Sequence, residues 1–145
     1  MPKAVIDRFF TAAGGESSRI AIIPISAPDP LPKEHWLVKE AKAREIESVT
    51  ILAGRTPEAV DQNEALAVLQ QATGVWFGGG RQWRFIDAYE DTQAHRALHA
   101  VLNRGGVIGG TSAGASIQAE YMVRGNPLGS RDIMAEGYER GLGFL

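Results

Sequence analysis

The chain has 145 residues, of which 44% are hydrophobic and 22% charged, a composition ordinary for one soluble globular domain. The net charge of −2 and the lack of a basic block argue against binding to nucleic acid or a membrane surface. The absence of cysteine excludes disulfides, thiolate chemistry and cysteine-ligated metal. No apolar run approaches the ~18 residues of a transmembrane helix, and Asp7 and Arg8 interrupt the N-terminal stretch before a signal-peptide core forms. The compartment stays open, with the cytoplasm slightly favoured.

The first third of the chain predicts a helix, a strand and a second helix. Apolar residues recur at helical spacing over residues 2–13, and Gly14-Gly15 ends that helix. The continuous apolar run of residues 20–25 is typical of a strand buried on both faces. A proline-rich loop over residues 26–32 follows, and then a helix over residues 33–44.

The middle of the chain repeats this alternation. β-Branched residues predict a strand over residues 48–52, and residues 54–57 form a turn. A helix opens at Asp61 or Gln62 and runs to Ala72. A third strand covers residues 74–77.

The third strand ends in a glycine loop, residues 78–82, and a short helix begins over residues 83–89. Thr92 caps the next helix, which Gly105-Gly106 ends. Residues 107–109 form a fourth strand, and residues 113–122 continue as helix. Beyond Arg124 the chain is irregular.

Strands that alternate with helices predict an α/β fold, in which helices cover both faces of a mostly parallel sheet. No composition shift marks a domain boundary, so residues 1–145 are expected to form one domain. Sites of such folds lie outside the carboxyl ends of the strands. The glycine loop 78–82 and the turn at Ser112 both lie at such ends.

Gly110, Ser112 and Gly114 match the G-x-S-x-G pattern of a nucleophile elbow, in which a serine sits on a tight strand-to-helix turn. A Cβ on either side of the serine would clash there, and the N-terminus of the helix offers unpaired N–H groups to an oxyanion. The pattern by itself also fits a glycine-rich turn without catalysis. The loop 78–82 has a competing interpretation as a phosphate cradle, but it lacks the P-loop motif.

A serine nucleophile needs an adjacent base, and the histidines of the chain are His35, His95 and His99. The i,i+4 spacing of His95 and His99 allows two zinc ligands on one helix face. Without an H-E-x-x-H motif or an evident third ligand, we expect a solvated helix face and no metal site.

Several motifs, in order and spacing, resemble those of the cyanophycinases and the related peptidase E family of aspartyl dipeptidases. These motifs are Gly109–Ala115, Asp7-Arg8-Phe9 with Ala13–Glu16, Ile22-Ile23-Pro24 with Ser26-Ala27, Phe77–Gln82, and Gly141–Leu145. The resemblance covers nearly the whole chain. It implies a three-layer α/β/α fold similar to class I glutamine amidotransferases (flavodoxin-like).

The resemblance also implies site roles. Ser112 would be the nucleophile, the N–H groups of Gly80 and Ala113 would form the oxyanion hole, and Gln82 would line the substrate pocket. Arg81 stands where the family usually has an acid or amide, which places a cation at the pocket mouth.

The family's catalytic histidine follows the segment that Gly141–Leu145 resembles, and the family begins with a strand before the first helix. We therefore expect a domain incomplete at both ends, which pairs with a missing C-terminal segment or forms a homodimer through an exposed sheet edge. The third triad member falls between the nucleophile and that histidine. Asp132 is preferred, and Glu120 and Glu136 are the alternatives.

The expected function is hydrolysis of an aspartyl-linked peptide or a β-Asp-Arg isopeptide bond, without a cofactor. The alternative is a non-catalytic relative that binds a peptide or small ligand in the same pocket. A third alternative is an amidotransferase-like domain, against which the absence of cysteine counts.

Overall fold

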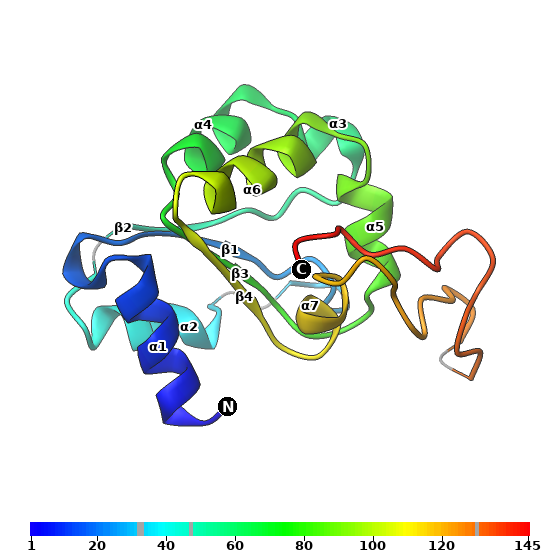
Figure 1. The fold of residues 1–145 in the computed structure, drawn as a ribbon, viewed down its shortest axis with the longest axis horizontal. Helices are drawn as coiled ribbons and strands as arrows, with labels where there is room; N and C mark the ends of the chain where they lie inside the picture. Colours follow the sequence, from blue (N-terminus) through cyan, green and yellow to red (C-terminus); the bar gives the residue numbers. More distant parts are fainter. Residues whose placement is uncertain (32–33, 47, 130) are drawn as a thin grey trace.

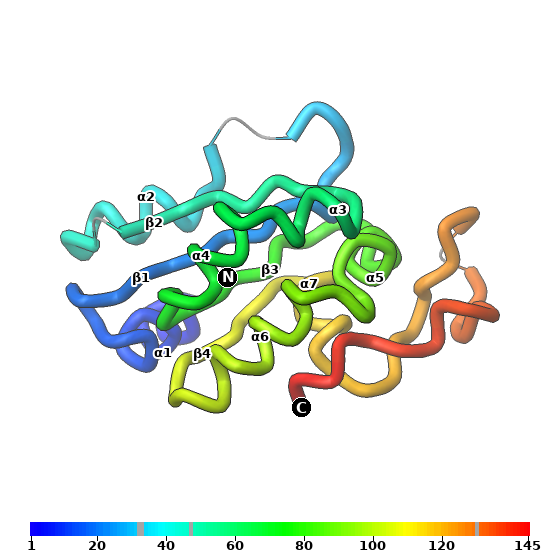
Figure 2. The backbone as a smooth tube through the Cα atoms, turned by 90° about the horizontal axis from the view of Figure 1, so that it is seen from above, coloured from blue at the N-terminus to red at the C-terminus, as the bar shows by residue number. Residues whose placement is uncertain are grey.

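The computed structural model describes residues 1–31, 34–46, 48–129 and 131–145. Its centre is a four-stranded parallel sheet in the order β2-β1-β3-β4, which Figure 2 shows from above. The strands are β1 (Arg19–Ile23), β2 (Ser48–Ile51), β3 (Gly74–Phe77) and β4 (Val107–Gly110). Each of the four strands predicted from the sequence is confirmed to within two residues at either end.

Helices cover both faces of the sheet, which gives three layers and confirms the predicted fold class (Figure 1). One face carries α1 (Lys3–Ala13) and α2 (Trp36–Lys42). The other carries α3 (Pro57–Val60), α4 (Asn63–Gln71), α5 (Trp83–Tyr89) and α6 (Gln93–Asn103), while α7 (Ala113–Ser116) follows β4 and the 3₁₀ turn η1 (Gly15–Ser17) follows α1. None of the helices in the described ranges has the length and hydrophobicity needed to cross a bilayer.

The central strands supply side chains to two separate cores. Ile20 and Ile22 of β1 belong to the core under α1 and α2, whereas Ala21 and Ile23 belong to the core under α4 and α6. Successive side chains of a strand point to opposite faces. A strand covered on both faces therefore reads as a continuous apolar run.

The helix predicted over residues 113–122 is wrong in its length, since α7 ends at Ser116. The carbonyl groups of Ile117 and Gln118 accept hydrogen bonds from the N–H groups of Leu142 and Phe144. A continued helix would have used those carbonyls internally. The C-terminal segment therefore competes with the helix, a long-range effect that no local pattern encodes.

Two smaller boundaries also differ from the expectation. Pro57 opens the separate short helix α3, which Thr56 caps through its hydroxyl, where the sequence predicted a turn into a single later helix. The helix expected over residues 33–44 begins at Trp36, because the His35 ring caps it; residue 33 lies outside the described ranges.

Candidate active site

Three loops meet at the carboxyl edge of the sheet, following β1, β3 and β4. The Ser26 hydroxyl donates to the Gly78 carbonyl at 3.1 Å, and the Arg81 N–H donates to the Ser26 carbonyl at 2.9 Å. These bonds join the loops after β1 and β3, between which the strand order reverses. Such a reversal is the usual ligand position in open α/β sheets.

The turn after β4 holds Ser112 in a strained backbone conformation. The Gly114 N–H donates to the Thr111 carbonyl at 2.9 Å, which closes a four-residue turn. Ser112 occupies its second position with φ 51° and ψ −115°, close to the glycine-favouring geometry of a type II′ turn. A residue with a Cβ held there costs about 1–3 kcal/mol, and such strain clusters at functional sites. The serine side chain is exposed.

Ser112→Gly is therefore expected to be more stable than Ser112→Ala by about 1 kcal/mol, because glycine relieves the strain but gives back part of the gain as unfolded-chain entropy. Urea unfolding of the two variants measures the difference. Both lack the hydroxyl, so the comparison reports on the backbone alone. Equal stabilities, or a more stable alanine variant, would contradict the assignment of strain.

The glycines on either side of Ser112 are required by close backbone approach, as the motif predicts. A Cβ on Gly110 would lie within 3 Å of the carbonyl group of Gly114, and a Cβ on Gly114 would lie within 3 Å of the carbonyl group of Phe77 in β3. The turn thus packs directly on the end of the central sheet. This contact fixes the position of the serine relative to the glycine loop.

Two backbone N–H groups beside Ser112 are available to a ligand. In the described part of the chain neither the Gly80 nor the Ala113 N–H donates to a protein acceptor. Gly80 has φ 148°, and a Cβ there would collide with the Ser26 carbonyl, so only glycine brings this N–H to the site. Unpaired donors of this kind are what an oxyanion hole requires.

A cavity of about 630 Å³ brings five of the six predicted site residues together. Ser112, Ala113, Gly80, Arg81 and Gln82 all line it. Among the described residues, the remaining wall consists of Ser116, Val123, Arg124 and Ile133. Of these four, the last three lie in a segment without periodicity, where the sequence offers no signal for a site.

A family model described as Peptidase family S51 matches residues 3–145. The chain belongs to peptidase family S51.

Curated relatives with a stated activity agree with the S51 assignment and confirm the resemblance found in the motifs. A cyanophycinase from Synechococcus elongatus is 30% identical over 125 residues, which cover 83% of this chain and 38% of the relative. A cyanophycinase from Trichormus variabilis is 29% identical over 129 residues, which cover 88% of this chain and 43% of the relative. The chain thus spans about two fifths of the length of these relatives.

Solved structures show the same fold. A peptidase from an acI-B1 Actinobacterium superposes with a TM-score of 0.70 at 17% identity, over 97% of this chain and 58% of that one. A putative peptidase E from Listeria monocytogenes EGD-e superposes with a TM-score of 0.63 at 16% identity, over 97% of this chain and 69% of that one.

In this S51 family member, the side chains of Arg81 and Gln82 donate hydrogen bonds to backbone carbonyl groups of the segment after α7. Gln82 Nε2 donates to the Val123 carbonyl at 2.8 Å. Arg81 Nη2 lies 3.2 and 3.3 Å from the carbonyl oxygens of Asn126 and Pro127. Both side chains therefore tie the glycine loop to the segment after α7. Their predicted role in substrate binding stays a prediction.

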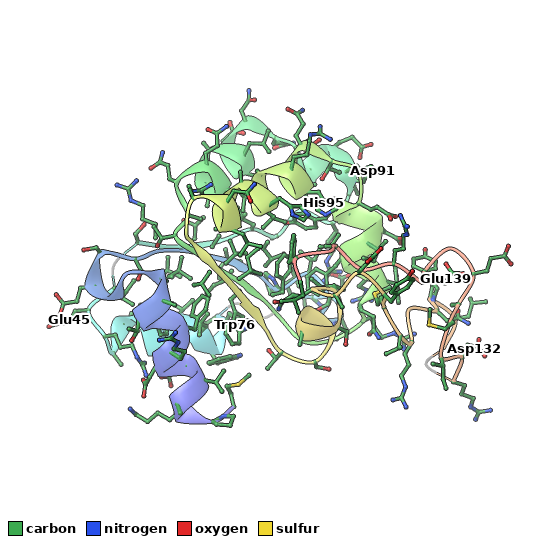
Figure 3. All side chains as sticks on the ribbon, viewed as in Figure 1. Glu45, Trp76, Asp91, His95, Asp132 and Glu139 are labelled. Carbon is green, nitrogen blue, oxygen red and sulfur yellow. The ribbon has the colours of Figure 1, made fainter. Side chains whose placement is uncertain are left out.

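Asp132, the predicted triad acid, is absent from the cavity wall. Its carboxylate is exposed and accepts a hydrogen bond from Asn126 Nδ2 at 2.6 Å. Figure 3 shows it on the C-terminal loop, well away from α7. Its catalytic role stays a prediction. In this arrangement the Asp132 carboxylate makes a hydrogen bond within the C-terminal loop.

The three histidines each lie within hydrogen-bond distance of a backbone group. Burial lowers the pKa of His35, and its Nδ1 lies 3.3 Å from the Leu37 N–H at the start of α2. His95 and His99 each direct Nε2 at the Leu142 carbonyl, at 2.9 and 3.1 Å. A carbonyl only accepts, so both Nε2 atoms carry hydrogen.

The expectation of a solvated face for His95 and His99 is wrong. Both rings are half-buried, and both contact the ring of Phe144, which covers this part of α6. No group of three potential metal ligands exists in the described ranges. The two histidines instead anchor the C-terminal segment on α6.

Proposed function

We propose that Ser112 is the nucleophile of a serine peptidase site. The observation that carries the proposal is the strained turn: it exposes the Ser112 side chain in a cavity that also contains the free N–H groups of Gly80 and Ala113. If Ser112 had no catalytic role, a glycine at position 112 would relieve the backbone strain without loss of function. Membership of family S51 supports the same role.

In the proposed reaction, Ser112 Oγ attacks the carbonyl carbon of the scissile bond, and the hydroxyl proton passes to the nitrogen of the amine that will leave. The carbonyl oxygen takes up the negative charge and accepts hydrogen bonds from the N–H groups of Gly80 and Ala113. Collapse of this intermediate breaks the C–N bond, and the amine leaves with a proton. Water then hydrolyses the acyl ester and restores the serine.

The proposed substrate is an aspartyl-linked peptide or a β-Asp-Arg isopeptide bond. The activity of the two relatives supports this choice, since both are cyanophycinases. The cavity adds support through the cations Arg81 and Arg124, which suit a substrate with carboxylates.

The alternative function is peptide binding without hydrolysis. It is favoured by the identity of the groups around Ser112: in the described ranges, no histidine or carboxylate lines the cavity. A serine site without its base keeps a rate enhancement of only ~10³–10⁴ over water, supplied by the oxyanion hole and by binding. The two functions therefore share one cavity and differ in turnover.

Labelling with a fluorophosphonate probe tests the nucleophile. We expect a covalent adduct on the peptide that contains Ser112, found by mass spectrometry, and its loss in Ser112→Ala. Ser17→Ala, which removes an exposed hydroxyl far along the chain from the site, serves as the control and should label like the native chain. Labelling that persists in Ser112→Ala, or none at all, contradicts the proposal.

Turnover of a β-Asp-Arg dipeptide then separates the two functions. Release of free arginine that depends on Ser112 supports hydrolysis. Binding of the dipeptide without release supports the alternative.

A further inference from the structure

We propose that Arg124 is a specificity-determining residue of this cavity, which selects ligands that carry a carboxylate beside the scissile bond. The inference rests on the proposed function, because it places the peptide bond at Ser112. The sequence offered no signal for Arg124, which lies where the predicted irregular segment begins.

The charged side chains of the cavity are positive, although the net charge of the whole chain is negative. Arg81 and Arg124 line it, and no acidic residue in the described ranges does so, while the whole chain has a net charge of −2. Neither arginine takes part in an ion pair within the described ranges. A concave site lined by charges of one sign attracts a ligand of the other sign.

The two arginines differ in how far they are engaged. Arg81 contacts the carbonyl groups of Asn126 and Pro127, which commits part of its guanidinium to the protein. No side-chain hydrogen bond of Arg124 occurs in the described ranges. Arg124 is therefore the cation that a ligand in the cavity meets without first displacing a protein partner.

The backbone that carries Arg124 is held on both sides. Its N–H donates to the Ile133 carbonyl at 2.7 Å, and its φ of 59° is left-handed, which is uncommon for a residue with a side chain. Around it, residues 120–122 pair with residues 139–141 through a bridge between Tyr121 and Arg140. The pairing of these two segments closes the chain between them into a loop, visible at the right of Figure 1.

Further bonds fasten this loop to the rest of the site. Gln82 holds Val123 at 2.8 Å, and the Tyr138 hydroxyl donates to the Asp87 carboxylate of α5 at 2.8 Å. The backbone at Arg124 is thus positioned before a ligand arrives. Such preorganisation reduces the entropy lost on binding.

An arginine at such a wall discriminates a carboxylate from an amide of nearly the same shape. The carboxylate accepts charge-assisted hydrogen bonds from the guanidinium, whereas the amide brings no charge and directs its own N–H donors at another donor. The ratio of the two affinities therefore isolates the contribution of Arg124 from shape and apolar contact.

The test compares two capped dipeptides, with Asp or Asn on the acyl side of the peptide bond, bound to the chain in a Ser112→Ala background. Dissociation constants come from calorimetry or NMR titration. We expect the Asp peptide to bind about tenfold more tightly, and Arg124→Gln to bring the ratio close to one with little change for the Asn peptide. Arg131→Gln, an exposed arginine of the same loop outside the cavity, should leave the ratio unchanged.

Arg81→Gln supplies a second readout. Because Arg81 fastens the loop and commits part of its guanidinium to it, its loss should weaken both peptides and lower the ratio less than Arg124→Gln does. A ratio that survives in Arg124→Gln overturns the inference, and so does equal or absent binding of the two peptides in the Ser112→Ala background.

Failure of the proposed function would look different. If fluorophosphonate labelling shows no dependence on Ser112 while the Arg124-dependent ratio holds, the cavity binds acidic peptides without cleaving them. If labelling succeeds and the ratio is insensitive to Arg124, the nucleophile stands and this inference falls.

Discussion

Gly114→Ala is expected to destabilise the fold by about 3 kcal/mol, although alanine is the better helix former. The reason is the neighbour that the added Cβ meets. It would lie within 3 Å of the Phe77 carbonyl and also close to the Phe77 Cβ. Phe77 belongs to the central strand β3, which is paired on both sides, so its backbone cannot retreat. We expect α7 to shift instead, with a matching loss of Ser112 labelling.

Equilibrium unfolding in urea measures this effect, and Gly129→Ala provides the matched control. A Cβ on Gly129 meets no atom within 4 Å among the residues that the structure describes, so the same substitution there should change stability by no more than about 0.5 kcal/mol. Similar stabilities for the two variants would show that α7 is not wedged against β3. The position of Ser112 would then need another explanation.

The architecture could be predicted because the buried strands carry an unambiguous pattern. Val75, Trp76 and Phe77 form a short apolar run, since helices cover both faces of β3. The order of helices and strands then implies parallel pairing, and parallel pairing places the ends of β3 and β4 at one edge. That chain of reasoning led to the cavity between the glycine loop and Ser112.

The rest of the site depends on contacts between segments far apart in the sequence. The partners of Gln82 and Arg81 lie more than forty positions downstream, in a stretch without periodicity. The short α7 and the clamp of His95 and His99 on Leu142 have the same origin, because the C-terminal segment supplies both. Local pattern identifies which residues can form an element, whereas these contacts decide where it ends and what its polar side chains bind.

Trp76→Ala is expected to cost about 3–5 kcal/mol, the range for removing a large aromatic side chain from a core. Trp76 is fully buried and is labelled in Figure 3, on the side of the sheet that α1 covers. Its ring packs edge-to-face on Phe9 of α1 at 4.9 Å and on Trp36 of α2 at 5.7 Å between centroids. Truncation would empty the centre of this layer, because the small residue Gly109 faces the ring from β4 and cannot fill the space.

A loss of that size approaches the total stability of a small domain, so Trp76→Phe provides a second measurement. The Trp76 indole N–H is buried without a hydrogen-bond partner in the described ranges, and phenylalanine removes this unsatisfied donor while it keeps most of the aromatic contact. We expect Trp76→Phe to lose less than half as much stability as Trp76→Ala in urea unfolding, and to retain Ser112 labelling. If the two variants were equally unstable, an unseen partner of the indole N–H, and not the packing of α1 and α2, would hold this layer together.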